Sequence, residues 1–200
     1  MRTVLLIRHG AVVGDADRRF IGATDWPMSE AGEAQIRRLA ERLGERFPIA
    51  SITCSDLARS RRTAELLAAG REVPIHVRPA LREIDLGAWE GVLRAEVARS
   101  EPAEYARRGR EIVHYRPPGG ESFSDLALRV LPCWRSLITD GRDEVVAVAG
   151  HCGVNRVILC DTLGMPLENL FRIGQRPGCL NLIAWSASAP VVRLLDAVEL

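Results

Sequence analysis

Lysine is absent from this 200-residue sequence, since all 27 basic side chains are arginine; they face 26 Asp and Glu, so the formal net charge is only +1. A protein that mainly coats nucleic acid or an anionic membrane needs a large excess of positive charge, which this sequence lacks. We therefore expect no nucleic-acid or membrane partner, and each arginine has to be interpreted from its own position.

Long apolar runs are also missing. The first one, residues 3–7, stops at Arg8 and is too short for a signal peptide, and no later stretch approaches the roughly 18 apolar residues of a membrane span. The cysteines are odd in number and include no CxxC pair, which argues against a disulfide framework and a zinc site. We expect a cytoplasmic protein with reduced thiols at Cys54, Cys133, Cys152, Cys160 and Cys179.

Short apolar runs alternate with segments of helical periodicity along the whole chain. The alternation predicts an α/β layered sheet, and no repeat or linker divides it, so we expect one domain over residues 1–200. Strands are predicted at 3–7, 49–54, 74–77, 144–150, 179–185 and 191–198, and helices at 29–47, 56–69, 122–138 and 155–163.

Two segments do not follow this alternation of strands and helices. The segment 94–118 mixes six arginines with Pro102 and Gly109, and we expect one helix and a long loop that cover something. Pro132 lies inside the helix predicted at 122–138 and can end or kink it.

Two of the predicted buried strands end in the same way. One runs into Arg8-His9-Gly10 and the other into Gly150-His151. Ligands of open α/β sheets bind beyond the carboxyl ends of the strands, so we expect the two imidazoles to share a cleft. A lone histidine is more often structural, but two in equivalent places, with an arginine fork and a glycine beside one of them, favour an anion site.

Arg8-His9-Gly10 after an apolar strand resembles the signature of the histidine phosphatase superfamily, the phosphoglycerate-mutase-like enzymes. Three residues are weak evidence alone, but the resemblance continues, in the family's order, over nearly the whole chain. It implies a three-layer sandwich with a mostly parallel central sheet and helices on both faces, and a 94–118 cap over the active site. The further matching segments are 20–32, 55–64, 81–91, 119–122 and 150–154.

The resemblance implies roles for individual residues. His9 is the nucleophile that accepts the phosphoryl group, Glu83 is the proton donor, and no metal or cofactor takes part. An imidazole suits the first role because its ordinary pKa of about 6.5 leaves it neutral near pH 7. The catalytic set is Arg8, His9, Arg59, Glu83 and His151, and the implied substrate contacts are Arg8, Gly10, Gly22, Arg59, Glu83, His151 and Cys152.

Neighbouring residues offer alternatives to some of these roles. Asp85 or Glu90 could replace Glu83 as the acid, although the motif register favours Glu83. Cys152 is expected to be a small packing residue and not a nucleophile, because the sequence has no cysteine-phosphatase loop ending in arginine. Asp15 departs from the family, since an Asn often stands there and a carboxylate would repel phosphate. We expect Arg61 and Arg62 on the surface.

The main hypothesis is a metal-independent phosphatase of a small phosphorylated metabolite, similar to the branch that includes α-ribazole phosphatase, with sugar or glycerate phosphates as other substrates. The alternatives are a cofactor-dependent phosphoglycerate mutase and a catalytically silent phosphate binder. Apolar C-terminal strands ending in Leu200 also leave a homodimer possible. Basic side chains in the cap segment could meet a second anionic group or merely keep a helix solvated: Arg107, Arg108, Arg110, His114 and Arg116.

Overall fold

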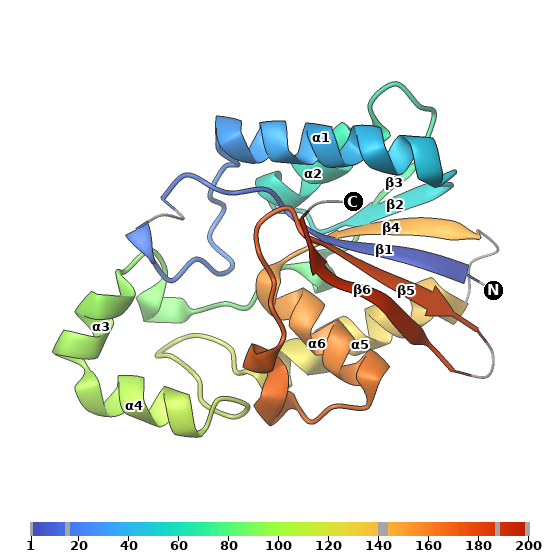
Figure 1. Ribbon diagram of the computed structural model, residues 1–200. Coiled ribbons are helices and arrows are strands. Elements are labelled where there is room, and N and C mark those ends of the chain that lie inside the picture. The colour runs from blue at the N-terminus through green and yellow to red at the C-terminus, as the bar shows by residue number, and fades with distance from the viewer. Residues whose placement is uncertain (1, 15–16, 140–143, 187–188, 199–200) are drawn as a thin grey trace.

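The computed structural model describes residues 2–14, 17–139, 144–186 and 189–198. At its centre is a six-stranded sheet with the order β3-β2-β4-β1-β5-β6 (Figure 1). The strands are β1 (Arg2–Arg8), β2 (Ser51–Cys54), β3 (Ile75–Val77), β4 (Val145–Gly150), β5 (Leu180–Trp185) and β6 (Val191–Ala197). Every predicted strand is present within a residue or two of its expected bounds. Asp15 and Leu200, on which two of the expectations depend, lie outside the described residues.

The sheet is mostly parallel, as predicted. β3, β2, β4 and β1 run in the same direction, and only β5 and β6 are antiparallel to their neighbours. The register pairs Arg8 of β1 with Gly150 of β4. Because these paired residues end their strands, His9 and His151 leave the sheet side by side.

Helices cover both faces of the sheet (Figure 1). On one face lie α1 (Glu30–Arg46) and α2 (Ala58–Ala68), and on the other lie α5 (Phe123–Thr139) and α6 (Cys152–Leu163). Leu5 and Ile7 of β1 belong to the first core, whereas Val4 and Leu6 belong to the second. A strand buried on both faces is apolar at every position, which explains the unbroken run before Arg8.

The start of α6 differs from the prediction. The helix begins at Cys152, three residues before the expected position, with His151 as its N-cap residue and no side-chain cap. The sequence therefore carries no Ser, Thr, Asp or Asn to mark this start. The early start matters for the site because it places the amide of Gly153 in the first turn of the helix, where an amide has no acceptor within the helix.

The cap segment also differs. We expected one helix in 94–118, and the chain forms two, α3 (Arg94–Ser100) and α4 (Pro102–Arg110). Pro102 has no amide hydrogen and occupies the first turn of the new helix, where none is needed. Both helices lie beyond the carboxyl ends of β1 and β4 (Figure 1). Pro132, in contrast, does not end α5, which continues to Thr139.

Three short 3₁₀ helices complete the described part of the chain. They are η2 (Pro79–Leu81), η3 (Gly87–Trp89) and η4 (Leu167–Arg172). The first two flank the loop that carries Glu83. Within the described residues, no helix has the length and apolar character needed to cross a membrane.

Candidate active site

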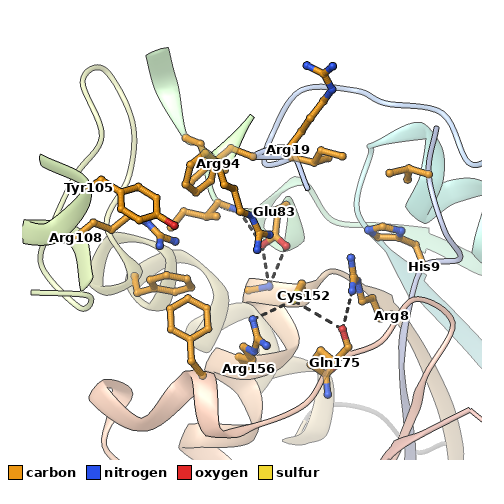
Figure 2. A pocket seen from close by; sticks show the side chains of 18 residues that line it. Arg8, His9, Arg19, Glu83, Arg94, Tyr105, Arg108, Cys152, Arg156 and Gln175 are labelled. Atoms are coloured by element: carbon orange, nitrogen blue, oxygen red, sulfur yellow. Dashed lines mark hydrogen bonds between the residues drawn. The ribbon is translucent and has the colours of Figure 1, made fainter. Parts of the chain in front are cut away.

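A cavity of about 370 Å³ opens at the carboxyl ends of the parallel strands (Figure 2). Arg8 and His9 line it from the end of β1, Glu83 from the loop after η2, and Cys152 from the start of α6. Its volume is near the lower end of the usual range for small-molecule sites, about 300 to 1,000 Å³. The cavity is therefore suited to a small ligand at the position that the strand ends predict.

His9 is held with one ring nitrogen toward the cavity side. Its Nδ1 lies 2.7 Å from the carbonyl oxygen of Gly10, and a carbonyl only accepts hydrogen bonds, so Nδ1 carries the hydrogen. In the neutral ring the lone pair is then on Nε2. Burial, followed by the charges of Arg8 and Arg59, lowers the pKa of His9 well below 6.5. The ring is therefore neutral at neutral pH.

Two guanidinium groups flank His9 and are fixed by main-chain oxygens. Arg8 donates from Nη1 to the carbonyl of Gln175 at 2.6 Å. Arg59 is fully buried and donates to the carbonyls of Thr24 at 2.8 Å and Gly22 at 2.5 Å. Burial lowers the pKa of Arg59 below its ordinary value. These bonds fix the direction of each planar fork, which a lysine could not reproduce.

His151 stands beside His9, with 5.2 Å between ring centroids. Its Nε2 lies 2.7 Å from the hydroxyl of Ser55, and that oxygen also accepts from the amide of Leu57. Burial, then the charge of Arg59, lowers the pKa of His151 well below 6.5, so this ring is neutral too.

Three buried nitrogen atoms around His9 have no hydrogen-bond partner among the described residues: Arg8 Nε, Arg59 Nε and His151 Nδ1. The two guanidinium nitrogens always carry hydrogen. A buried N–H without an acceptor is destabilising by about 1 to 3 kcal/mol, so two such donors in one place indicate a bound acceptor. The non-bridging oxygens of a phosphoryl group match such a set in charge and number. We call Arg8, His9, Arg59 and His151 the phosphoryl end. Arg8 and His9 line the cavity, whereas Arg59 and His151 are fully buried beside His9 and are not among its lining residues.

Glu83 lies against the first turn of α6. Its two carboxyl oxygens accept from the amide of Gly153 at 3.1 and 2.9 Å, and one of them also accepts from the amide of Ile84 at 3.0 Å. A Cβ on residue 153 would lie 2.5 Å from Glu83 Oε1, so only glycine permits this approach. Glu83 is 5% exposed and lines the cavity.

The two other candidate acids have different tasks. Glu90 accepts from the amides of Gly22, Ala23 and Leu86, at 3.1, 2.8 and 3.0 Å, and so ties two loops together. Asp85 accepts from the amide of Gly87 at 2.8 Å. Neither lines the cavity, whereas Glu83 does. The geometry therefore supports the choice that the motif register makes.

The predicted contacts at Gly10, Gly22 and Cys152 fall in different places. Gly10 and Gly22 do not line the cavity; a Cβ there would lie 2.3 Å from the carbonyl oxygens of Gly32 and Ile84 respectively. Both glycines permit close packing of the loops around His9. Cys152 does line the cavity, and burial raises the pKa of its thiol, which argues against a thiolate nucleophile.

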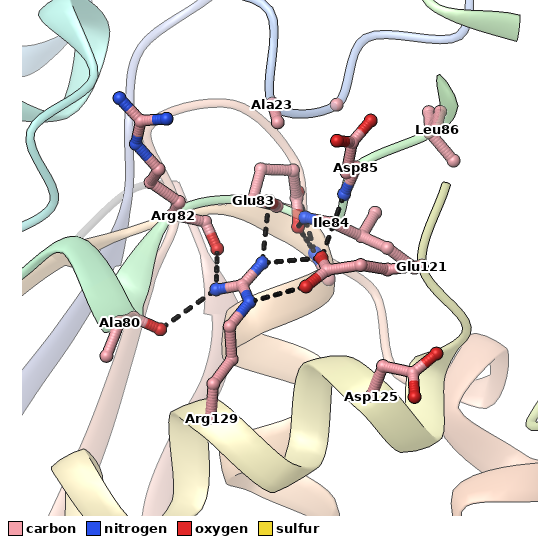
Figure 3. A network of polar contacts seen from close by, with 12 residues as sticks. Ala23, Ala80, Arg82, Glu83, Ile84, Asp85, Leu86, Glu121, Asp125 and Arg129 are labelled. Atoms are coloured by element: carbon pink, nitrogen blue, oxygen red, sulfur yellow. Dashed lines mark hydrogen bonds and ion pairs between the residues drawn. The ribbon is translucent and has the colours of Figure 1, made fainter. Parts of the chain in front are cut away.

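Sequence reasoning missed the support behind Glu83, which Figure 3 shows. Arg129 of α5 donates to the carbonyls of Ala80, Arg82 and Glu83 at 2.7 to 2.9 Å. It also forms a two-pronged ion pair with Glu121 at 2.9 and 2.8 Å. Burial opposes the charged form of Glu121, but the bond from Arg129 and the amide of Asp85 hold its pKa below 4.5. This clamp fixes the path of the loop that carries Glu83.

A buried amide cluster behind Arg8 was missed as well. Gln175 accepts from Asn155 and Asn181 at 2.9 and 3.1 Å and donates to Asn181 at 2.8 Å. Asn181 in turn donates to the carbonyl of Leu6 at 3.0 Å. No motif marks these residues in the sequence. Only their spatial closeness to the end of β1 reveals that they hold the carbonyl to which Arg8 donates.

Comparison with known proteins agrees with this geometry. The family model of the histidine phosphatase superfamily (branch 1) matches residues 4–197. A glucosyl-3-phosphoglycerate phosphatase of Mycolicibacterium vanbaalenii is 33% identical over 177 residues, covering 84% of this chain and 77% of that protein. A 2,3-bisphosphoglycerate-dependent phosphoglycerate mutase of Gloeobacter violaceus is 34% identical over 166 residues, covering 80% and 75%.

Solved structures show the same relationship. The crystal structure of a putative alpha-ribazole-5'-P phosphatase from Escherichia coli superposes with a TM-score of 0.90 at 25% identity, covering 98% of this chain and 97% of that one. The site and the fold define an enzyme of phosphoryl chemistry. The chain belongs to the histidine phosphatase superfamily, and the predicted three-layer fold and phosphomonoesterase class are confirmed.

Proposed function

We propose that the protein hydrolyses a small phosphomonoester in two steps, with His9 as the nucleophile. Nε2 of His9 attacks phosphorus, a P–N bond forms, and the P–O bond to the leaving alkoxide breaks. Arg8, Arg59 and His151 donate hydrogen bonds to the non-bridging oxygens as their charge redistributes. Dividing the reaction in this way replaces one difficult displacement by two easier ones.

Glu83 carries the protons in both steps. In its protonated form it gives a proton to the leaving alkoxide, which is a poor leaving group without one. A water molecule then attacks the phosphohistidine, Glu83 takes its proton, and the P–N bond breaks to release inorganic phosphate. The enzyme returns to its starting state. In this scheme Gly153 and Ile84 orient the carboxyl group through their amides.

The observation that carries this proposal is the neutral His9 ring, with its hydrogen held on Nδ1, beside the buried guanidinium donors Arg8 Nε and Arg59 Nε, which lack partners among the described residues. Trapping of the phosphoenzyme tests it. On rapid mixing with a ³²P-labelled aryl phosphate, the parent protein should retain acid-labile, alkali-stable label, and His9→Ala should retain none. Hydrolysis by His9→Ala should fall by about 10³-fold or more. Unchanged hydrolysis by the variant would rule out His9 as the nucleophile.

The similarity to a phosphoglycerate mutase makes phosphoryl transfer to a second hydroxyl the alternative. The product of the same experiment separates the two reactions. Free phosphate from the labelled enzyme supports hydrolysis. Transfer of the label to an added phosphoglycerate, without phosphate release, supports the mutase.

We also propose that residues 94–118 act as the cap of a single domain over residues 1–200. Arg94 of α3 and Tyr105 and Arg108 of α4 form part of the cavity wall, opposite the phosphoryl end. The substrate's leaving group therefore lies against this segment, and exchange of the segment should alter the substrate preference.

A further inference from the structure

Besides Arg8, four arginines line the cavity, and one of them, Arg19, pairs with Asp17 at 3.3 Å. The other three come from three different elements: Arg94 from α3, Arg108 from α4 and Arg156 from α6 (Figure 2). We call them the distal arginines. In the described parts of the chain, none of the three has a carboxylate within ion-pair distance. This contrasts with Arg107 and Arg116 of the cap, which pair with Glu111 and Asp125 at 3.0 and 2.5 Å.

Aromatic rings support these cations. Arg94 and Arg108 lie over the ring of Phe20, at 5.7 and 5.3 Å from its centroid. Arg108 and Arg156 lie over the ring of Phe171, at 5.8 and 4.9 Å. A ring face attracts the cation without occupying its in-plane N–H donors, which leaves donors available to a ligand.

The grouping is electrostatically unfavourable without a ligand. Arg108 shares the Phe20 ring with Arg94 and the Phe171 ring with Arg156, so it stands between two like charges. Burial, then the charge of Arg94, lowers the pKa of Arg108 below its ordinary value. Among the described residues, only one of the three guanidinium groups forms hydrogen bonds. Arg156 donates to the carbonyl of Ile173 at 3.0 Å and lies 3.1 Å from the Cys152 sulfur. An anion would relieve the repulsion.

The structure assigns the distal arginines to a second anion subsite, so that the preferred substrate is a small phosphomonoester that carries a further carboxylate or phosphate on its leaving group. This inference rests on the proposed function, because it needs the phosphoryl end to hold the scissile phosphate. Glu83 is the only acidic residue among those that line the described cavity. A substrate with an anionic group at each end therefore meets complementary charge at both ends of the cavity.

Three probes of equal carbon length test the subsite: propyl phosphate, 2-carboxyethyl phosphate and propane-1,3-diyl bisphosphate. The readout is the ratio of kcat/KM for each anionic probe to kcat/KM for propyl phosphate. This ratio does not depend on the fraction of folded enzyme. We expect a ratio of about 10 to 100 for at least one anionic probe, the usual effect of a charged hydrogen bond. The higher ratio identifies the second group as carboxylate or phosphate.

Arg108→Gln should reduce that ratio to near one. Arg110→Gln is the matched control, since Arg110 is exposed on the same helix and does not line the cavity, and it should keep the parent ratio. A parent ratio near one, with propyl phosphate hydrolysed and His9 labelled, would overturn the subsite and leave the proposed function intact. Retention of the ratio by Arg108→Gln would also overturn it. If no probe is hydrolysed and no phosphoenzyme forms, the proposed function fails first.

Discussion

The two ends of the cavity hold their arginines by different means. At the phosphoryl end, Arg8 and Arg59 donate to backbone carbonyls; Arg59 is fully buried and Arg8 is half-buried. At the distal end, Arg94 and Arg108 lie on aromatic rings and keep part of their surface exposed. Main-chain hydrogen bonds fix direction, whereas ring contacts fix mainly charge and approximate place. The fixed arginines suit a phosphoryl group, which is the same in every substrate. The less rigidly held arginines suit a contact that differs from one substrate to another.

The largest expected change in kcat/KM that tests this comparison comes from replacing arginine by lysine at each end. Arg59→Lys keeps the charge but loses the fork that reaches two carbonyls and the phosphoryl site, and kcat/KM should fall by about 10²-fold or more. Arg94→Lys should reduce kcat/KM for the anionic probe by less than about 10-fold, because a point charge suffices there. Steady-state kinetics on the anionic probe measure both.

Arg37→Lys is the matched control for these two variants. Arg37 is exposed and pairs with Glu33 one helical turn away, far from the cavity lining. Its kinetics should match those of the parent. Equal losses in Arg59→Lys and Arg94→Lys would show that the two ends do not differ in the way that their contacts indicate.

A smaller, more selective effect is expected at the loop between the two ends. Arg129→Met removes the clamp behind Glu83 and should impair proton donation to the leaving group, with a loss of about 10²-fold on an alkyl phosphate. p-Nitrophenolate leaves readily without a proton, so hydrolysis of p-nitrophenyl phosphate should fall much less. The ratio of the two rates separates a positioning role from simple loss of folded protein. A ratio equal to that of the parent would contradict this role.

The smallest effect concerns stability and pH. His9 and His151 have pKa values well below 6.5 in the folded protein, whereas the unfolded chain takes up their protons near 6.5. The contribution of these two neutral rings to the free energy of unfolding is therefore full above pH 6.5 and is lost as the pH falls below that value. Each ring should contribute a slope of about 1.4 kcal/mol per pH unit between pH 6.5 and 5.

Urea unfolding in phosphate-free buffer at several pH values measures this slope. The double variant His9→Gln/His151→Gln should lose the slope in that window. Arg94→Gln at the distal end should retain it, since no buried histidine lies there. A slope that survives in the double variant would place its origin outside the phosphoryl end.

Sequence reasoning is successful where local pattern and chemistry coincide. The runs before Arg8 and Gly150 predict parallel buried strands, and the structure has them. The residues that follow predict two imidazoles in one cleft; the rings do lie side by side, but only His9 lines the cavity. It fails where partners are far apart in the chain. Arg129 is 46 residues from the Glu83 carbonyl that it holds, and Arg8 is 167 residues from Gln175. No local periodicity encodes such contacts.

The distal arginines show the same limit in another form. Of the five basic cap residues considered from the sequence, only Arg108 lines the cavity, and its partner Arg156 lies on α6, outside that segment. The break between α3 and α4 at Glu101, which the single-helix prediction missed, separates Arg94 from Arg108 and brings them to the same ring. Tertiary packing decides which charges converge, and composition cannot.

The amide cluster behind Arg8 has a consequence for which changes the protein tolerates. The carbonyl oxygen of Leu6 can only accept a hydrogen bond, so the end of the Asn181 amide that faces it is the NH2 group. The oxygen of Asn181 then accepts from the NH2 group of Gln175. The oxygen of Gln175 accepts in turn from the NH2 group of Asn155. Conversion of one amide to the carboxylate of identical shape would set two oxygens against each other and add a negative charge near Arg8. At these positions the polarity of a side chain, and not its size, decides whether Arg8 keeps its place.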